Sequence, residues 1–231
     1  MRLFNGILYD MKFQLRHGFY YAYAFISIVY VAILKFLPGS ISEDAVILII
    51  FSDPSVLGAF FIGAIFILEK SQNTLEGIFI TPIRIWEYIF SKVISLTLIS
   101  MISSFIIAFV NSIGNLNMLV LFFGVFLTSI FYTFLGFIIA VYSKNTNQYL
   151  MNCSVIGIFL IPIVEYLGIL SSPLFYIFPG KASLILIEGA FRPVVVFNVI
   201  YSAILLSLWC CAAYFLLKKV FYKKVILRIG G

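Results

Sequence analysis

The sequence has little charge and few of the side chains that perform chemistry. Charged residues make up only 10% of its 231 residues, and it contains one histidine and three cysteines. Cys153, Cys210 and Cys211 lie in apolar segments without the spacing of metal ligands, so we expect them to be packing residues. His17 is expected at the surface, and the scattered serines suggest no nucleophile–base pair. These absences predict a protein with no metal site and no catalytic residues.

Three further absences narrow the function. No segment matches the phosphate-binding pattern G-x-x-x-x-G-K-[ST], so the chain is not expected to bind ATP itself. The net charge is +6, but no basic cluster has the polar and aromatic surface of a nucleic-acid binder, and we expect no nucleic-acid partner. The first 18 residues lack an apolar core with a small-residue cleavage site, so no cleavable signal peptide is expected.

Apolar residues are abundant instead. They make up 63% of the chain, compared with roughly 45–50% in soluble domains. Because about 20 helical residues cross a hydrocarbon core of about 30 Å, the apolar runs predict an all-α membrane protein with six transmembrane helices in a single domain, residues 1–231. The expected spans are residues 19–37, 45–68, 93–113, 118–142, 149–168 and 194–217.

The first 17 residues form a separate amphipathic segment. Its apolar residues recur at helical spacing, and its bases fall largely elsewhere on the helix. The pattern predicts a helix over residues 1–17 in the cytoplasmic membrane interface, near anionic lipid headgroups. An ordinary helix packed on protein is the alternative. The apolar stripe consists of Leu3, Phe4, Ile7, Leu8, Met11 and Leu15.

Proline interrupts two apolar stretches. In the second span Asp53 precedes Pro54, so it either caps a helix that begins at the proline or is a functional acid on a transport route. Residues 169–193 contain three prolines and are too interrupted to span a membrane, yet too apolar for a free loop. They predict a re-entrant pair of half helices between the last two spans, entering from the outer face.

The distribution of basic residues predicts the orientation. Of the 15 lysines and arginines, only Lys35, Lys181 and Arg192 lie in the segments on one side of the six spans, and the other 12 lie on the opposite side. Because basic loops stay in the cytoplasm, both termini are predicted to be cytoplasmic. The loop at residues 69–92 is on the same side, and the chain is expected in the bacterial plasma membrane.

The loop at residues 69–92 is the longest run that contains both signs of charge. Thr81-Pro82 in its middle can end one helix and begin another, because proline fits a first helical turn and threonine can cap it. The loop is therefore predicted to form two short helices at the membrane surface. Its apolar residues favour a platform for a soluble partner over a passive solvated loop.

The same loop contains an ordered set of residues. It has a glutamate and a base, then Thr-Leu-Glu, then Thr-Pro-Ile, and finally a glutamate and a lysine. These positions are Glu69, Lys70, Thr74, Leu75, Glu76, Thr81, Pro82, Ile83, Glu87 and Lys92, with residues 52–54 and 61–64 upstream. The pattern resembles the cytoplasmic segment of ABC-2 type transporter permeases, and the upstream match resembles their fluoroquinolone-export branch. Asn73 stands where the family often has glycine, and asparagine also tolerates positive φ.

The resemblance implies a transmembrane subunit that works with a separate ABC ATPase. Two copies of the ATPase are expected to bind ATP and Mg, a second permease chain completes the assembly, and this chain holds no cofactor. Leu75, Ile78 and Phe79 are expected to contact a cleft of the ATPase, where Glu69 and Glu76 pair with basic residues. The expected coupling residues are Glu69, Lys70, Thr74, Leu75, Glu76, Ile78, Phe79, Thr81 and Pro82.

Asp53, Glu165 and Glu188 lie in or near apolar segments, where carboxylates are costly and often functional. They are expected to line a substrate path that favours a cationic or zwitterionic compound. The predicted function is ATP-driven export of amphipathic drug-like or antibiotic compounds, with drug export resting on the branch resemblance. Lipid export shares this layout. The alternative is a membrane scaffold or immunity-type protein that binds a partner or a toxic peptide without transporting it.

Overall fold

The computed structural model of the chain describes residues 2–36, 39–52, 54–111, 116–169 and 172–227. Within these ranges every regular element is a helix, and six helical segments are long and apolar enough to cross a membrane. The all-α class and the six spans are therefore confirmed. Asp53 lies outside the described residues, so its two interpretations stay open.

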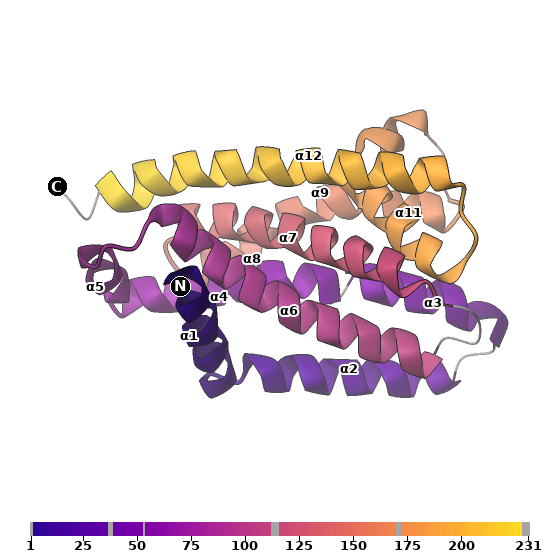
Figure 1. Cartoon of the computed structure of the whole chain (residues 1–231), viewed down its shortest axis with the longest axis horizontal. Helices are drawn as coiled ribbons and strands as arrows, with labels where there is room; N and C mark the ends of the chain where they lie inside the picture. Colours follow the sequence, from indigo (N-terminus) through magenta and orange to yellow (C-terminus); the bar gives the residue numbers. More distant parts are fainter. Residues whose placement is uncertain (1, 37–38, 53, 112–115, 170–171, 228–231) are drawn as a thin grey trace.

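Figure 1 shows the long helices running side by side along one axis, with α1 lying across them at one end. The same end holds α5, the start of α6 and the end of α12, and we call it the α5 end. The opposite end, the α11 end, holds α11 and α3. The helices are α1 Arg2–Arg16, α2 Phe19–Phe36, α3 Gly39–Ser52, α4 Pro54–Ser71, α5 Thr74–Ile80, α6 Ile85–Asn111, α7 Met118–Tyr142, α8 Thr146–Asn152, α9 Ile156–Leu160, α10 Pro162–Tyr166, α11 Pro179–Phe191 and α12 Val196–Phe221.

Helices α4 and α7 form the centre of the bundle, where glycine permits a close approach. A Cβ atom at Gly136 of α7 would overlap the backbone of Ala59 on α4. The ring of Tyr149 lies against Gly63, and its hydroxyl donates a hydrogen bond to the carbonyl oxygen of Ala59. These contacts leave no room for larger residues at the two glycines.

Of the two short helices predicted to meet at Thr81-Pro82, the first is present and ends there, but the second is absent within the described range 54–111. Helix α5 ends at Ile80, and α6 begins at Ile85 and continues as a single helix to Asn111. The Thr81 hydroxyl donates to the carbonyl oxygen of Ile78, so threonine closes the first helix rather than capping a second one. Instead, the Glu87 carboxylate accepts from the Arg84 N–H at 2.8 Å and caps the start of α6. The third span is therefore longer than predicted.

The fifth and sixth spans also differ from the predicted helices. The fifth begins earlier, because Asn145 accepts from the Gln148 N–H at 2.8 Å and caps α8. It is then broken into α8, a 3₁₀ turn at Cys153–Val155, α9 and α10, with Pro162 at the last break. The sixth, α12, extends beyond the predicted end and continues as a π-helical turn, Tyr222–Ile226.

The segment before the last span forms a 3₁₀ turn, Pro173–Ile177, followed by α11. Both elements begin with a proline. Proline fits a first helical turn because the N–H that it lacks would have no acceptor within the helix at that position. Most of α11 is buried, and it packs against α3, α7 and α12. Whether this segment re-enters a membrane stays a prediction.

Candidate functional site at the α5 end

Helix α5 has one buried and one exposed face. It follows α4 after a turn in which Asn73 adopts a left-handed conformation with φ 54°, as asparagine can. Ile80 at its end is 85% exposed, and Pro82, Ile83 and Trp86 beyond it are also exposed. This end of the molecule therefore presents an apolar tip, formed by Ile80, Pro82, Ile83 and Trp86.

The structure turns some of the expected contact residues inward. Leu75 is buried in the core, and the Phe79 ring packs on Tyr88 and Phe221 with centroids 5.3 and 5.7 Å apart. Ile78 is half-buried. The expectation that Leu75 contacts a partner is therefore corrected: the exposed apolar contact of α5 is Ile80.

The polar residues of the expected set differ in the same way. Glu76, Thr81 and Pro82 are exposed, and Thr74 is half-buried. Lys70 donates to the carbonyl oxygen of Ser143 at 3.2 Å, which ties the end of α4 to the end of α7.

Glu69 was expected to pair with a base of the partner, but it is buried and engaged within the chain. Its Oε1 atom accepts from Lys92 Nζ at 2.6 Å, and its Oε2 atom accepts from the Tyr88 hydroxyl at 2.6 Å. Both oxygens thus have donors from α6. In this structure Glu69 joins the two helices that flank α5, and it is not exposed to pair with a base of a protein partner.

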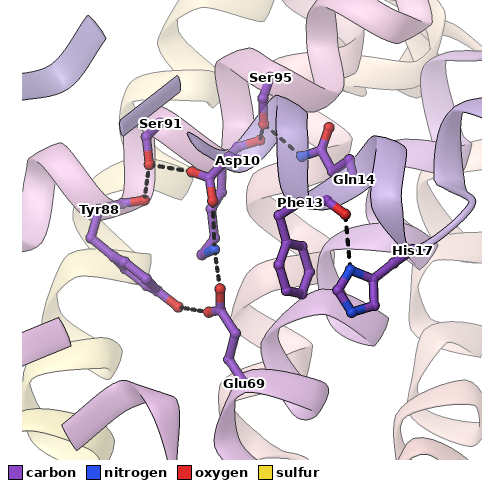
Figure 2. A network of polar contacts seen from close by, with 9 residues as sticks. Asp10, Phe13, Gln14, His17, Glu69, Tyr88, Ser91 and Ser95 are labelled. Carbon is purple, nitrogen blue, oxygen red and sulfur yellow. Dashed lines mark hydrogen bonds and ion pairs between the residues drawn. The ribbon is translucent and has the colours of Figure 1, made fainter. Parts of the chain in front are cut away.

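Asp10 completes the buried network from α1, and sequence reasoning did not single it out. Lys92 bridges Glu69 and Asp10, with Nζ 3.0 Å from Asp10 Oδ1, and Figure 2 shows both carboxylates in the same polar network. The second Asp10 oxygen accepts from the Ser91 hydroxyl at 2.6 Å. One ammonium therefore connects α1, α4 and α6 at a site from which water is largely excluded.

A second polar contact supports the same helix pairing. Gln14, four residues after Asp10, donates to Ser95, four residues after Ser91, at 2.7 Å. The polar face of α1 thus packs on α6, and apolar residues such as Phe4 are exposed. That orientation suits a helix with its apolar face toward lipid, although its location in the interface stays a prediction.

Two of the three acids expected on the substrate path, Glu165 and Glu188, lie at the α11 end, and the third, Asp53, lies outside the described residues. Glu165 pairs with Lys181 at 3.2 Å, and Glu188 is half-buried on α11. Nearby, Arg192 contacts Glu43 Oε2 at 3.2 Å and Asp44 Oδ1 at 2.8 Å. Glu165 is thus neutralised within the chain, and a role in a substrate path stays a prediction.

The charge of Arg192 is reinforced by its partners. Partial burial acts to lower the pKa of the guanidinium, but its hydrogen bond to Glu43 and the charge of Asp44 raise the pKa by more, so the net shift is upward. The group therefore stays positive at any physiological pH. Among the described residues, no cluster of three or more His, Cys, Asp or Glu side chains is placed to hold a metal ion.

The six apolar helical spans of the described residues define a multi-pass membrane protein. Comparison with known families is more specific: the chain belongs to the fluoroquinolones export permease protein family, whose model matches residues 1–229. Two fluoroquinolones export permease proteins of Mycobacterium tuberculosis, from strains CDC 1551 / Oshkosh and ATCC 25618 / H37Rv, are each 28% identical to it over 238 residues. Each alignment covers 99% of this chain and 98% of the relative.

Proposed function

We propose that this chain is the membrane-spanning subunit of an ATP-driven ABC exporter of amphipathic, drug-like compounds. In this proposal two copies of a separate ATPase subunit bind ATP and Mg, and two permease chains form the transport path. The α5 end faces the cytoplasm, in accord with the excess of basic residues in its segments. Membership of a fluoroquinolone export family supports the class of compound.

The exposed tip of α5 is the observation that supports the proposal most directly. Ile80 projects from a short helix whose opposite face is fixed in the core by Leu75 and Phe79. An apolar tip flanked by exposed Glu76 and Arg84 suits a protein partner better than water. Because α5 is joined to α4 and α6 by short turns, a partner that displaces it also moves two spans.

The proposal is tested with inside-out membrane vesicles that contain this chain and a candidate ABC ATPase subunit from the same organism. We expect ATP-dependent uptake of a fluorescent fluoroquinolone into the vesicles, and co-purification of the ATPase with the chain. The variant Ile80→Glu should abolish both, since a charge at the tip opposes an apolar contact while the exposed site tolerates it in the fold.

Ile169→Glu is the matched control, because it places the same charge at a 72% exposed residue that lies away from α5. This variant should retain the ATPase. Co-purification with Ile80→Glu as with the unmodified chain would contradict the proposed docking site. Partner binding without any ATP-dependent uptake across a panel of compounds would favour the scaffold alternative instead.

A further inference from the structure

A groove of about 550 Å³ lies beside the buried ion network, between α1, α5 and the start of α6. Its volume falls in the range of pockets that hold drug-sized compounds. Apolar and aromatic side chains, among them Tyr9, Ile78 and Ile83, form part of its wall, and Asp10, Glu69 and Lys92 reach it from the buried network. The groove thus combines an apolar surface with a few convergent charged groups.

The charges that line the groove favour a positive ligand. Asp10, Glu69 and Glu87 are the acids of the lining, and Arg2 and Lys92 are its bases. The three groups with the least access to water are two carboxylates that share a single ammonium. A buried carboxylate without a full counter-charge is costly, so a cation that enters the groove is stabilised there.

We infer that this groove binds the charged group of a monovalent, amphipathic organic cation. The Asp10 and Glu69 carboxylates attract the positive charge, and the exposed ring of Tyr9 offers a cation–π contact. The apolar part of the compound lies against Ile78 and Ile83. Binding requires no ATPase, whereas a role for the groove in receiving exported compounds rests on the proposed function.

The inference is tested with tetraphenylphosphonium and tetraphenylborate, two ions of nearly the same shape and opposite charge. Equilibrium dialysis of the full-length chain in phosphatidylcholine nanodiscs, with empty nanodiscs subtracted, measures the binding of each ion. We expect saturable binding of the cation, at least about tenfold tighter than that of the anion. The two carboxylates and one ammonium of the network leave one net negative charge, which attracts the cation and repels the anion.

Two variants locate the site. Gly77→Leu places a side chain in the groove without touching the ion network, since a Cβ atom at Gly77 meets nothing within 4 Å. It should weaken cation binding by about tenfold or more. Glu69→Gln removes one buried negative charge. It should weaken binding of the cation by about the same factor and should not weaken binding of the anion. Gly157→Leu is the matched control, because its Cβ also meets nothing within 4 Å, and it should bind as the unmodified chain does.

Two results would overturn the inference: equal binding of the two ions, or unchanged cation binding in Gly77→Leu. The second readout keeps the test decisive even where Glu69→Gln fails to fold. Failure of the site is also distinguishable from failure of the exporter. Cation binding without ATP-driven uptake would support the cation site and contradict the proposed function. ATP-driven uptake together with unchanged cation binding in Gly77→Leu would support the proposed function and contradict the cation site.

Discussion

Ion pairs lie at both ends of the helix bundle, but only those at the α5 end are buried. There the side chains of Lys92, Asp10 and Glu69 are 1%, 7% and 4% exposed. At the α11 end Lys181 and Glu165 are 16% and 14% exposed. The Arg192 side chain there is 37% exposed, and both of its acidic partners are 46% exposed. The distances at the two ends are similar, so access to water is the main physical difference.

This difference in exposure determines how strongly an ion pair holds its helices in one relative position. An exposed pair exchanges easily with water and contributes little to stability. A buried pair cannot exchange its contact for water, and loss of one member leaves the other charge buried with neither a partner nor water around it. The network at the α5 end therefore holds α1, α4 and α6 in one relative position. In the proposed exporter we expect these helices to move together, while the α11 end separates more easily.

The largest effect is expected from Lys92→Met, which leaves two buried carboxylates without an ammonium. Removing one partner of a buried ion pair costs about 3–5 kcal/mol. For a chain of this length that lowers the unfolding temperature by about 10 °C. Thermal unfolding of the purified chain in detergent, followed by circular dichroism, measures the shift.

Lys218→Met is the matched control, because it removes the same charge from an exposed site on α12. The neutral triple variant Asp10→Asn, Glu69→Gln and Lys92→Met sharpens the comparison. It should recover part of the lost stability, because no unpaired charge remains buried. A Lys92→Met chain as stable as the unmodified one would show that water reaches the network, and the contrast between the two ends would fail.

A smaller effect is expected from Tyr88→Phe, which removes the donor to Glu69 Oε2. The carboxylate keeps its ion pair but has one oxygen without a partner, at a cost of about 1–3 kcal/mol. We expect the unfolding temperature to fall by about 5 °C, measured as above. Tyr21→Phe, at an exposed tyrosine of α2, should leave it unchanged. A shift in Tyr88→Phe as small as this control's would assign Lys92 alone the role of holding Glu69.

The sequence was sufficient to predict the spans because hydropathy acts locally, over the length of one helix. It could not reveal the network, because Asp10 and Lys92 are 82 residues apart and no local pattern connects them. One signal was available: Asp10 and Gln14 lie one helical turn apart on α1, as Ser91 and Ser95 do on α6. Such matched polar faces suggest a helix pair but do not identify the partner.

The face of α5 was equally hard to predict. The helix has only seven residues, and Leu75, Ile78, Phe79 and Ile80 are all apolar, so nearly every direction around it looks like a contact face. Periodicity needs a longer window to separate a buried from an exposed side. The structure decides this through the ring of Phe221 on α12, which packs on Phe79 and lies far along the chain. Only the folded bundle therefore leaves Ile80 as the exposed tip.

The smallest effect is expected from Arg192→Gln at the α11 end. Its partners Glu43 and Asp44 are already partly hydrated, so loss of the guanidinium costs no more than about 1 kcal/mol. The unfolding temperature should fall by at most about 3 °C. The shift should shrink further in 0.5 M salt, since screening weakens exposed pairs, whereas salt should leave the Lys92→Met shift unchanged. A salt-independent loss in Arg192→Gln as large as that in Lys92→Met would mean that the α11 end is fastened as firmly as the α5 end, and the proposed exporter would then have no weakly held end to open.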